Sequence, residues 1–445
     1  MSRALHRSLV LLAAMSGVAL WASNGAAVPS FARQTGMACN VCHTTFPQLT
    51  KFGRRFKAIG YTLSEEKQIK ASKGKASSPL ELNEIVPLSF MAQASLTTTH
   101  EHQPGTQNND AQFPQQLSLL LAGSIADYVG SFLQVTYTPE DDHFGMDNAD
   151  IRYARTTTAA ESDLVYGLTL NNNPTVEDLW NSTPAWGFPW TSSETAPTPA
   201  AAALIDGALA QDVTGLGAYA LWNDHLYVAG AVYRSEHVGG AQPPDDSSEN
   251  TLDGVAPYWR LAWQQSWGPN YLAVGTYGLY ARLYPEGVSG DTDDYTDIAF
   301  DFQYERTIGG DLLAVRSTYI HEDQDLNATF AAGGSANRSN GLDTFRINGT
   351  YNRSSWGMLS LGYFLTRGDA DEGLYAPAPA DGSASGSPDS EGLIAEIGLF
   401  PWQNLRLSLL YTAYFQFNGA ANNYDGDGRD AADNNTIYWL GWFMW

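Results

Sequence analysis

The sequence predicts a mainly β protein: a 16-stranded antiparallel β-barrel of the outer-membrane type, with a small helical domain at its N-terminus. Three observations predict this fold class. Only 16% of the 445 residues are charged, where soluble domains have about 25%, and aromatic residues reach 12%. From Leu82 onward, apolar and polar residues alternate with the period of a β-strand. The mean hydropathy of −0.27 is too polar for a bundle of membrane-spanning helices.

Residues 1–27 have the pattern of a secretory signal peptide. Arg3 and Arg7 precede an apolar run from Leu9 to Leu20, and the small residues Gly25, Ala26 and Ala27 follow it. The run is shorter than the roughly 20 residues that a membrane-spanning helix needs. An uncleaved anchor is the alternative. We expect cleavage after Ala27 and a mature protein beyond the inner membrane.

The two cysteines form a C-x-x-C-H motif, Cys39-Asn40-Val41-Cys42-His43. On a tight turn, two thiols at this spacing can reach both vinyl groups of one haem, and the adjacent imidazole can ligate the iron. The alternative is a redox disulfide of the thioredoxin type, which requires a βαβ setting that does not surround the motif. The motif therefore predicts one covalent haem c, attached through Cys39 and Cys42, with His43 as axial ligand.

A short amphipathic helix is expected after this motif. Leu49, Phe52, Phe56 and Ile59 recur at three- and four-residue steps, and basic residues occupy the other side. We expect the apolar stripe to cover the haem. The predicted domain boundaries are 28–61 for a monohaem cytochrome c domain, 62–80 for a Lys- and Ser-rich linker, and 81–445 for the barrel.

The predicted parts carry opposite charges. Residues 28–80 contain nine Lys and Arg against two acids, a net charge of +7. The chain beyond Leu80 contains 13 Arg against 46 acids, a net charge of −33. Because a haem domain of this size is too small to bury its cofactor alone, we expect it to dock in the acidic barrel. A cytochrome tethered below the barrel is the alternative.

The barrel prediction depends on the order of the connections, because a soluble sandwich would show the same alternation of residues. Long connections, including the Pro- and Trp-rich stretch 174–199, alternate with tight turns. External loops and periplasmic turns of an outer-membrane barrel have this order, and 16 strands leave an aqueous lumen. The chain ends in an aromatic strand that finishes at Trp445. Predicted strands span 82–98, 115–126, 129–138, 148–158, 163–171, 207–222, 226–235, 254–267, 271–284, 294–307, 312–322, 342–353, 358–368, 391–401, 405–418 and 435–445.

The run from Phe31 to Tyr61, which includes Cys39, Cys42 and His43, resembles the fused monohaem cytochrome–porins, the outer-membrane iron oxidases of iron-oxidising bacteria. The resemblance covers about thirty residues, and the barrel is similar in architecture only. It implies that Fe(II) is oxidised at the cell surface and that the electron passes through the haem to a soluble periplasmic carrier, a cytochrome c or a cupredoxin.

Other candidate site residues have weaker signals. Met91 has the lumen-facing parity of the first strand and is a candidate distal haem ligand, although ordinary packing is the alternative. His100 and His102 form an H-x-H pair that a solvated loop also explains. Carboxylates suit hard cations such as Fe(II). Acid clusters are expected in the outer loops, at Asp245/Asp246, Asp291/Asp293/Asp294/Asp297, Glu322/Asp323/Asp325, Asp369/Asp371/Glu372 and Asp425/Asp427/Asp430/Asp433.

These features predict an oxidoreductase in the outer membrane of a Gram-negative bacterium, with its N-terminus on the periplasmic side and outer-membrane lipid around it. Its expected partners are extracellular Fe(II) and the periplasmic electron carrier, whereas the net charge of −24 disfavours nucleic acid. Two alternatives remain open: a cation-favouring transport barrel with a haem plug, and an electron conduit for a different extracellular donor.

Overall fold

The structure is a computed structural model that describes residues 30–63, 86–139, 142–236, 250–285, 287–354 and 356–445. The predicted signal peptide, residues 1–27, and most of the predicted linker lie outside the described residues. Among the described residues, no helix is long and apolar enough to cross a membrane.

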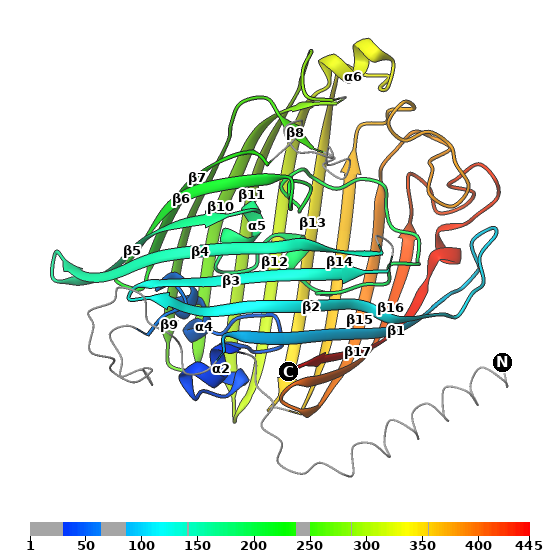
Figure 1. Cartoon of the computed structure of the whole chain (residues 1–445). Helices are drawn as coiled ribbons and strands as arrows, with labels where there is room; N and C mark the ends of the chain where they lie inside the picture. The colour runs from blue at the N-terminus through cyan, green and yellow to red at the C-terminus, as the bar shows by residue number, and fades with distance from the viewer. Residues whose placement is uncertain (1–29, 64–85, 140–141, 237–249, 286, 355) are drawn as a thin grey trace.

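The strands close into one antiparallel barrel, because each long strand pairs with its neighbours along the chain and β1 pairs with both β2 and β17 (Figure 1). A closed ring excludes the soluble sandwich, and the prediction of 16 long strands is confirmed. A further strand of two residues, β8, pairs with the end of β10. The strands are β1 Leu88–Thr99, β2 Asp110–Ala126, β3 Val129–Thr138, β4 His143–Ala159, β5 Ser162–Asn171, β6 Val213–Trp222, β7 Leu226–Ser235, β8 Thr251–Leu252, β9 Ala256–Trp267, β10 Asn270–Tyr284, β11 Asp293–Ile308, β12 Asp311–Asp325, β13 Ser339–Arg353, β14 Gly357–Gly368, β15 Ser390–Trp402, β16 Leu405–Gln416 and β17 Thr436–Met444.

Four predicted strand starts differ from the structure by five or six residues. β1 begins at Leu88 and not at residue 82, and residues 82–85 lie outside the described part of the chain. β2 begins at Asp110 and β4 at His143, five residues earlier than expected in each case. The connection near Asp141 is therefore shorter than predicted. β6 begins at Val213 and not at residue 207, because residues 207–212 belong to the preceding loop.

Side chains alternate between the lumen and the outer surface of the barrel. On β7, Tyr227 and Tyr233 are fully buried, whereas Val228 and Val232 are about half exposed. The outer surface carries large apolar residues on most strands, including Leu168, Phe300, Leu361 and Ile397. A two-residue period produces this pattern when one face of each strand meets an apolar surrounding and the other meets a polar interior.

The helices are short and lie at two ends of the barrel and inside it. The N-terminal helices α2 and α4 lie at the end with the short turns, and α6 lies at the opposite end (Figure 1). Thr50 caps α4 by accepting a hydrogen bond from the Gly53 amide. The bounds are α2 Ser30–Thr35, α3 Cys39–Cys42, α4 Lys51–Ala58, α5 Pro174–Glu177, η2 Pro184–Trp186, α6 Asn327–Ala332 and η3 Ala431–Asn434.

Residues 172–212, between β5 and β6, fold into the lumen and form an inward loop. The sequence prediction treated the Pro- and Trp-rich part of this segment as an external loop, and that prediction is wrong. Leu179 and Trp180 are almost fully buried against Tyr219, Tyr227 and Tyr271 of the barrel wall. The apolar and aromatic side chains of the loop account for this position, because they would be exposed to water outside the barrel.

Candidate functional site

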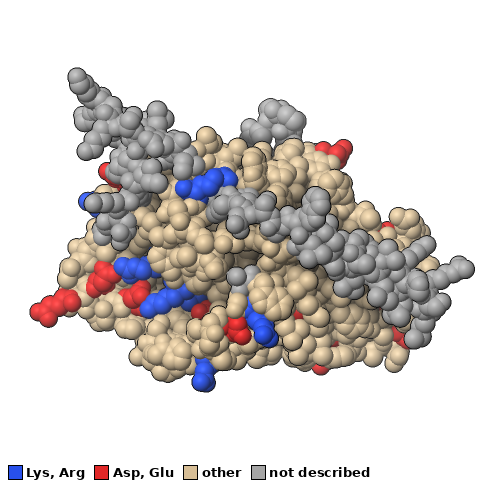
Figure 2. Space-filling view, turned by 90° about the horizontal axis from the view of Figure 1, so that it is seen from below, with Lys and Arg blue, Asp and Glu red and all other residues tan. Residues whose placement is uncertain are grey.

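Residues 30–63, here called the N-terminal plug, dock inside the barrel at its short-turn end. At the rim, Arg55 forms ion pairs with Asp163 at 2.6 Å and with Asp224 at 3.1 Å, and Lys51 contacts Asp224 at 3.0 Å. From below, Lys and Arg side chains lie beside Asp and Glu on this face (Figure 2). The opposite charges predicted from the sequence therefore meet, although half-exposed pairs of this kind stabilise docking only modestly.

A buried ion pair lies deeper in the same interface. Arg54 is 3% exposed, contacts Glu305 of β11 at 3.2 Å and lies 4.3 Å above the ring centroid of Tyr271. Its guanidinium also donates to the Leu49 carbonyl at 2.8 Å. Burial removes the screening of this pair but also desolvates both charges, so the pair specifies the position of the plug more than it stabilises it.

Close backbone contacts also fix the plug against the wall. A Cβ atom at Gly130 of β3 would lie 2.2 Å from the Gly60 carbonyl oxygen of the plug. Tyr219 of β6 donates a hydrogen bond of 2.8 Å to the Ala58 carbonyl. Glycine at position 130 is therefore required sterically, because any side chain there would overlap Gly60 and Tyr61, which follow α4.

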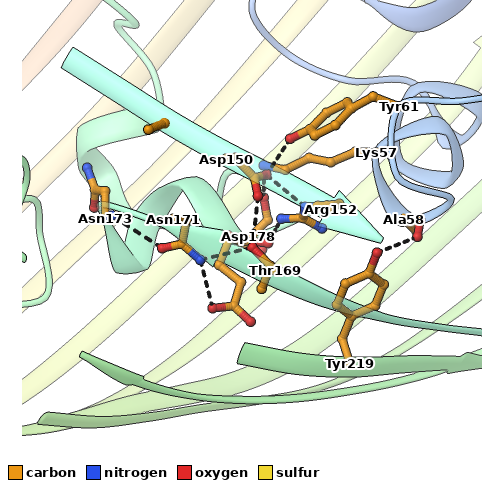
Figure 3. A network of polar contacts seen from close by, with 12 residues as sticks. Lys57, Ala58, Tyr61, Asp150, Arg152, Thr169, Asn171, Asn173, Asp178 and Tyr219 are labelled. Atoms are coloured by element: carbon orange, nitrogen blue, oxygen red, sulfur yellow. Dashed lines mark hydrogen bonds and ion pairs between the residues drawn. The ribbon is translucent and has the colours of Figure 1, made fainter. Parts of the chain in front are cut away.

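A polar network joins the plug, the wall and the inward loop (Figure 3). Tyr61 donates to Asp150 at 2.5 Å, and Asp150 pairs with Arg152 at 2.7 Å. Lys57 donates to the Asp178 carbonyl at 2.8 Å, which connects α4 to the loop after α5. Burial, followed by repulsion from Arg152, lowers the pKa of Lys57 to about 8.

The C-x-x-C-H motif forms a compact turn packed against α4. The His43 amide donates to the Cys39 carbonyl at 2.9 Å, and the Thr50 amide donates to the Cys42 carbonyl at 2.8 Å. A Cβ atom at Gly53 would lie 2.2 Å from the same Cys42 oxygen. The turn and the helix therefore form one unit, and both thiols of the turn are free of a disulfide.

The environment of the thiols does not resemble that of a redox disulfide. Burial raises the pKa of Cys42 to about 11, with a smaller contribution from Cys39, and raises the pKa of Cys39 above its usual value. Redox-active C-x-x-C motifs have the opposite property, a lowered thiol pKa that favours the thiolate. The thioredoxin alternative is therefore disfavoured on electrostatic grounds as well as by its setting.

The His43 ring is held by a backbone carbonyl. Its Nδ1 lies 3.1 Å from the Pro47 carbonyl oxygen, which can only accept a hydrogen bond. Nδ1 therefore carries the proton, and the lone pair of the neutral ring is on Nε2. Burial lowers the pKa of His43 to about 4, which keeps the imidazole neutral. A backbone carbonyl in this position is a common outer partner of metal-bound histidines.

A cavity of about 690 Å³ lies between the plug, the wall and the inward loop. Cys39, Cys42 and His43 line it together with Met91 of β1, so the structure brings all four predicted site residues to one cavity. Its volume lies within the range of cofactor pockets. Leu49, Phe52 and Phe56 also line it, as the helix pattern predicted, whereas Ile59 packs against a different cluster.

Sequence reasoning missed several residues of this cavity. Met37 and Met444 line it beside Met91, so three thioethers are present where the sequence indicated one. Trp186, Trp190 and Asp206 reach it from the inward loop. Strand parity could have indicated Met444, but no local signal in the sequence places the inward loop in the lumen.

The remaining predicted residues lie elsewhere. His100 is largely exposed, contacts Asp433 at 3.5 Å and does not line the cavity, and His102 is also exposed. Asp245 and Asp246 lie outside the described residues. No group of three or more His, Cys, Asp or Glu side chains suited to a metal ion occurs among the described residues.

Several acids predicted to project from the outer loops instead hold backbone amides. Asp297 on β11 accepts from the Ile205 amide at 2.9 Å, and Glu322 on β12 accepts from the Leu204 amide at 2.6 Å. Asp371 accepts from four loop amides, beginning with Ala336 at 2.7 Å, and these contacts lower its pKa to about 2 despite partial burial. The predicted placement of these acids in outer loops is therefore wrong for Asp297 and Glu322, which lie on strands and hold the inward loop.

These features define a closed 16-stranded antiparallel barrel, of the architecture found in outer-membrane porins, that holds its own N-terminal segment in the lumen. No family model matches the sequence, and no curated protein sequence is similar to it. Among solved structures, the anion-selective porin of Comamonas acidovorans has a TM-score of 0.46 at 11% identity, over 80% of this chain and 98% of that one.

Two further solved structures have the same degree of similarity. OmpF of Salmonella typhi, in a complex with daunomycin, has a TM-score of 0.45 at 13% identity, over 82% of this chain and 98% of that one. The outer membrane channel DcaP of Acinetobacter baumannii has a TM-score of 0.44 at 10% identity, over 84% of this chain and 100% of that one. These similarities concern the barrel alone and assign no ligand or activity.

Proposed function

We propose that the protein transfers electrons across the outer membrane, oxidising extracellular Fe(II) and passing the electron through one covalent haem c to a periplasmic carrier. The observation that carries this proposal is the cavity of about 690 Å³ lined by Cys39, Cys42 and His43. A C-x-x-C-H turn whose neutral imidazole has its lone pair on Nε2, at a largely apolar cavity in a barrel, combines attachment, ligation and enclosure of one cofactor.

The residues of the turn fit haem c. Each thiol would add across one vinyl group to form a C–S bond, a step that needs no oxidant. The Nε2 atom of His43 would ligate the iron, while the Pro47 carbonyl fixes the orientation of the ring and increases its basicity. Met91 is our candidate for the distal ligand, and Met37 and Met444 are competitors in the same cavity. When bound, haem supplies a reversible one-electron couple.

The position of the turn suits delivery to a soluble carrier. Asn40 and Val41 at its tip are exposed, and Val41 keeps 39% of its surface accessible. The tip lies at the short-turn end, which faces the periplasm in outer-membrane barrels. The apolar outer surface of the strands supports an outer-membrane location, and the N-terminus is then on the periplasmic side.

The choice of Fe(II) as donor rests on the resemblance of residues 31–61 to the cytochrome–porin iron oxidases. Exposed carboxylates at the long-loop end, such as Asp291, Asp323 and Asp325, would attract cations by long-range electrostatics. One electron leaves Fe(II) to give Fe(III) outside, and the carrier accepts one electron in the periplasm, so the overall transfer balances.

The first test is the haem content of the purified protein, followed by anaerobic stopped-flow spectroscopy of the α-band after mixing with Fe(II). We expect one covalent haem per chain and fast, saturable reduction. In His43→Ala the iron-dependent reduction should be lost, whereas His225→Ala, which alters a histidine outside the cavity, should keep it. A wild-type protein without covalent haem contradicts the proposal. If dithionite reduces the haem and Fe(II) does not, the protein accepts electrons from a donor other than Fe(II).

A second candidate function is a cation-favouring transport barrel with a haem plug. The observation in its favour is that polar side chains of the barrel wall, Gln93, Gln134 and Asn148, also line the cavity. Planar-bilayer conductance separates the two functions, because a channel conducts ions with the plug in place and an electron conduit does not require an open pore. Steady conductance of the haem-loaded wild type would favour transport.

A further inference from the structure

Two buried carboxyl groups lie side by side on the wall of the lumen. Asp297 of β11 and Glu322 of β12 are directly opposite each other in the strand register, and each is 1% exposed. One oxygen of each carboxyl accepts a backbone amide of the inward loop, at 2.9 Å from Ile205 and at 2.6 Å from Leu204. Both loop residues belong to a buried apolar cluster, so the two carboxyls hold the loop at a place where water does not solvate them.

One oxygen of this pair lacks a donor. Gln324 donates to Glu322 Oε1 at 2.6 Å, whereas Asp297 Oδ1 is buried and has no hydrogen-bond partner among the described residues. The two carboxyl groups lie within hydrogen-bonding reach of each other, and such a bond requires that one of them carries a proton. Two ionised carboxylates at this spacing would repel each other strongly, because burial removes the screening by water.

The surrounding charges do not compensate two ionised carboxylates. In the described part of the chain, no Lys, Arg or His forms an ion pair with Asp297 or Glu322, and Arg346 of β13 lies 3.7 Å from another acid, Asp206 of the inward loop. His321 is on the outer face of β12 and pairs with Asp343 at 2.8 Å. The other ionisable groups that act on the pair, from the inward loop, β12, β11 and the loop after β14, are Asp206, His321, Tyr295 and Tyr375.

We propose that Asp297 and Glu322 share one proton at neutral pH and that this proton-binding site closes the inward loop against the wall in a pH-dependent way. The shared proton supplies the donor that Asp297 lacks. When it leaves to solvent at higher pH, two adjacent negative charges repel each other and the Leu204–Ile205 segment separates from the wall. Asp206, the next residue, lines the cavity of Cys39 and His43, so this movement opens the cavity at the inward loop. The proposal does not depend on haem.

The direction of the pH dependence follows from the protons that each state binds. When the segment is open, both carboxyls reach water and ionise near about pH 4, as ordinary carboxyls do. The closed segment keeps one proton to higher pH, so closing binds a proton. The closed state therefore loses stability as pH rises from about 4 until the shared proton leaves, and one proton changes the opening equilibrium by at most about tenfold per pH unit.

The direct test is infrared difference spectroscopy of the purified mature protein in detergent at neutral pH, which detects the carbonyl stretch of a protonated carboxyl group. Asp297→Asn and Glu322→Gln should each remove the same band, because in either variant the amide supplies the donor and the remaining carboxyl ionises. The control Asp325→Asn, which alters an exposed residue of β12, should remove none. A band that survives in either variant, or wild-type difference spectra without a band, would overturn the shared proton.

The functional test is hydrogen–deuterium exchange at the Leu204 and Ile205 amides, corrected for the intrinsic rate. Trp180 of the same loop packs in a different cluster, so these two amides report on the segment at the pair. In the wild type and in Asp325→Asn, protection should fall as pH rises from about 5 to about 8, by up to about tenfold per unit.

Asp297→Asn should lose this dependence, because its side chain donates to Glu322 without titrating and keeps an oxygen for the Ile205 amide. Protection of these amides that does not change with pH in the wild type, or that falls equally in Asp297→Asn, would refute the proposal.

Discussion

The contact between Gly53 and the Cys42 carbonyl gives a sharp prediction about how the C-x-x-C-H turn is held. In Gly53→Ala, the new Cβ would lie 2.2 Å from the Cys42 oxygen, 3.0 Å from its carbonyl carbon and 3.2 Å from its Cα. All three are backbone atoms, and the oxygen also accepts the Thr50 amide at 2.8 Å. The turn must therefore move away from α4 as a unit.

Two opposing free-energy terms determine how much Gly53→Ala destabilises the contact between the turn and α4. Overpacking of a close contact costs about 3 kcal/mol at the upper end of the usual range, which fits an overlap with backbone rather than with a flexible side chain. Replacing glycine by alanine inside a helix returns about 1 kcal/mol. The expected net loss is about 2 kcal/mol for the turn–helix contact, which corresponds to a roughly thirtyfold larger equilibrium constant for opening.

Hydrogen–deuterium exchange at the Thr50 amide measures this opening, and the fraction of chains with covalent haem measures its consequence for the site. We expect roughly thirtyfold weaker protection and reduced haem attachment. Gly349→Ala is the matched control, because a Cβ at that strand position meets nothing within 4 Å. Protection in Gly53→Ala that equals or exceeds the wild type would refute the steric argument, since the helix-propensity gain would then dominate.

Three further predictions concern the plug, the inward loop and the distal ligand. Gly130→Ala should loosen the plug, because its Cβ would lie 2.2 Å from the Gly60 oxygen, and hydrogen exchange of the α4 amides should accelerate at least tenfold. The control Gly145→Ala places its Cβ in open space and should leave this exchange unchanged. Unchanged exchange in Gly130→Ala would count against the contact. Burial raises the pKa of Glu177 to about 7, so the docked inward loop binds more protons than the undocked loop between pH 4.5 and 7. The stability of the docked state therefore falls as pH rises through that window, by up to roughly 3 kcal/mol. Hydrogen exchange at the Trp180 amide, corrected for the intrinsic rate, should show this pH dependence in the wild type and in the control Glu372→Gln, which alters an exposed residue. The pH dependence should be lost in Glu177→Gln. If it persists there, another titrating group causes it. Met91→Leu should lower the haem midpoint potential and remove the near-infrared charge-transfer band of Met-ligated ferric haem, and Met146→Leu, on an exposed residue, should change neither. An intact band in Met91→Leu would transfer the distal role to Met37 or Met444.

The strand pattern of the barrel was predictable because it is encoded locally. Alternation with a period of two assigns each side chain to one face of its strand, so Met91, Asp297 and Phe300 could be assigned to inner or outer faces without a structure. The C-x-x-C-H motif was equally local, since the thiols and the imidazole lie within five residues. The ends of β2 and β4 were less predictable, because pairing with a neighbouring strand extends them beyond their own alternating stretch.

The sequence by itself therefore determined the barrel, its strand count, the position of the C-x-x-C-H motif and the opposite charges of plug and wall. Only the tertiary structure decided which partners meet. The inward position of residues 172–212, the convergence of Met37, Met91 and Met444 on one cavity, and the sharing of Glu305 by two arginines all join segments far apart in the chain. The physical reason is that strand periodicity fixes the direction of a side chain, whereas the closure of the ring and the packing inside it fix its neighbours.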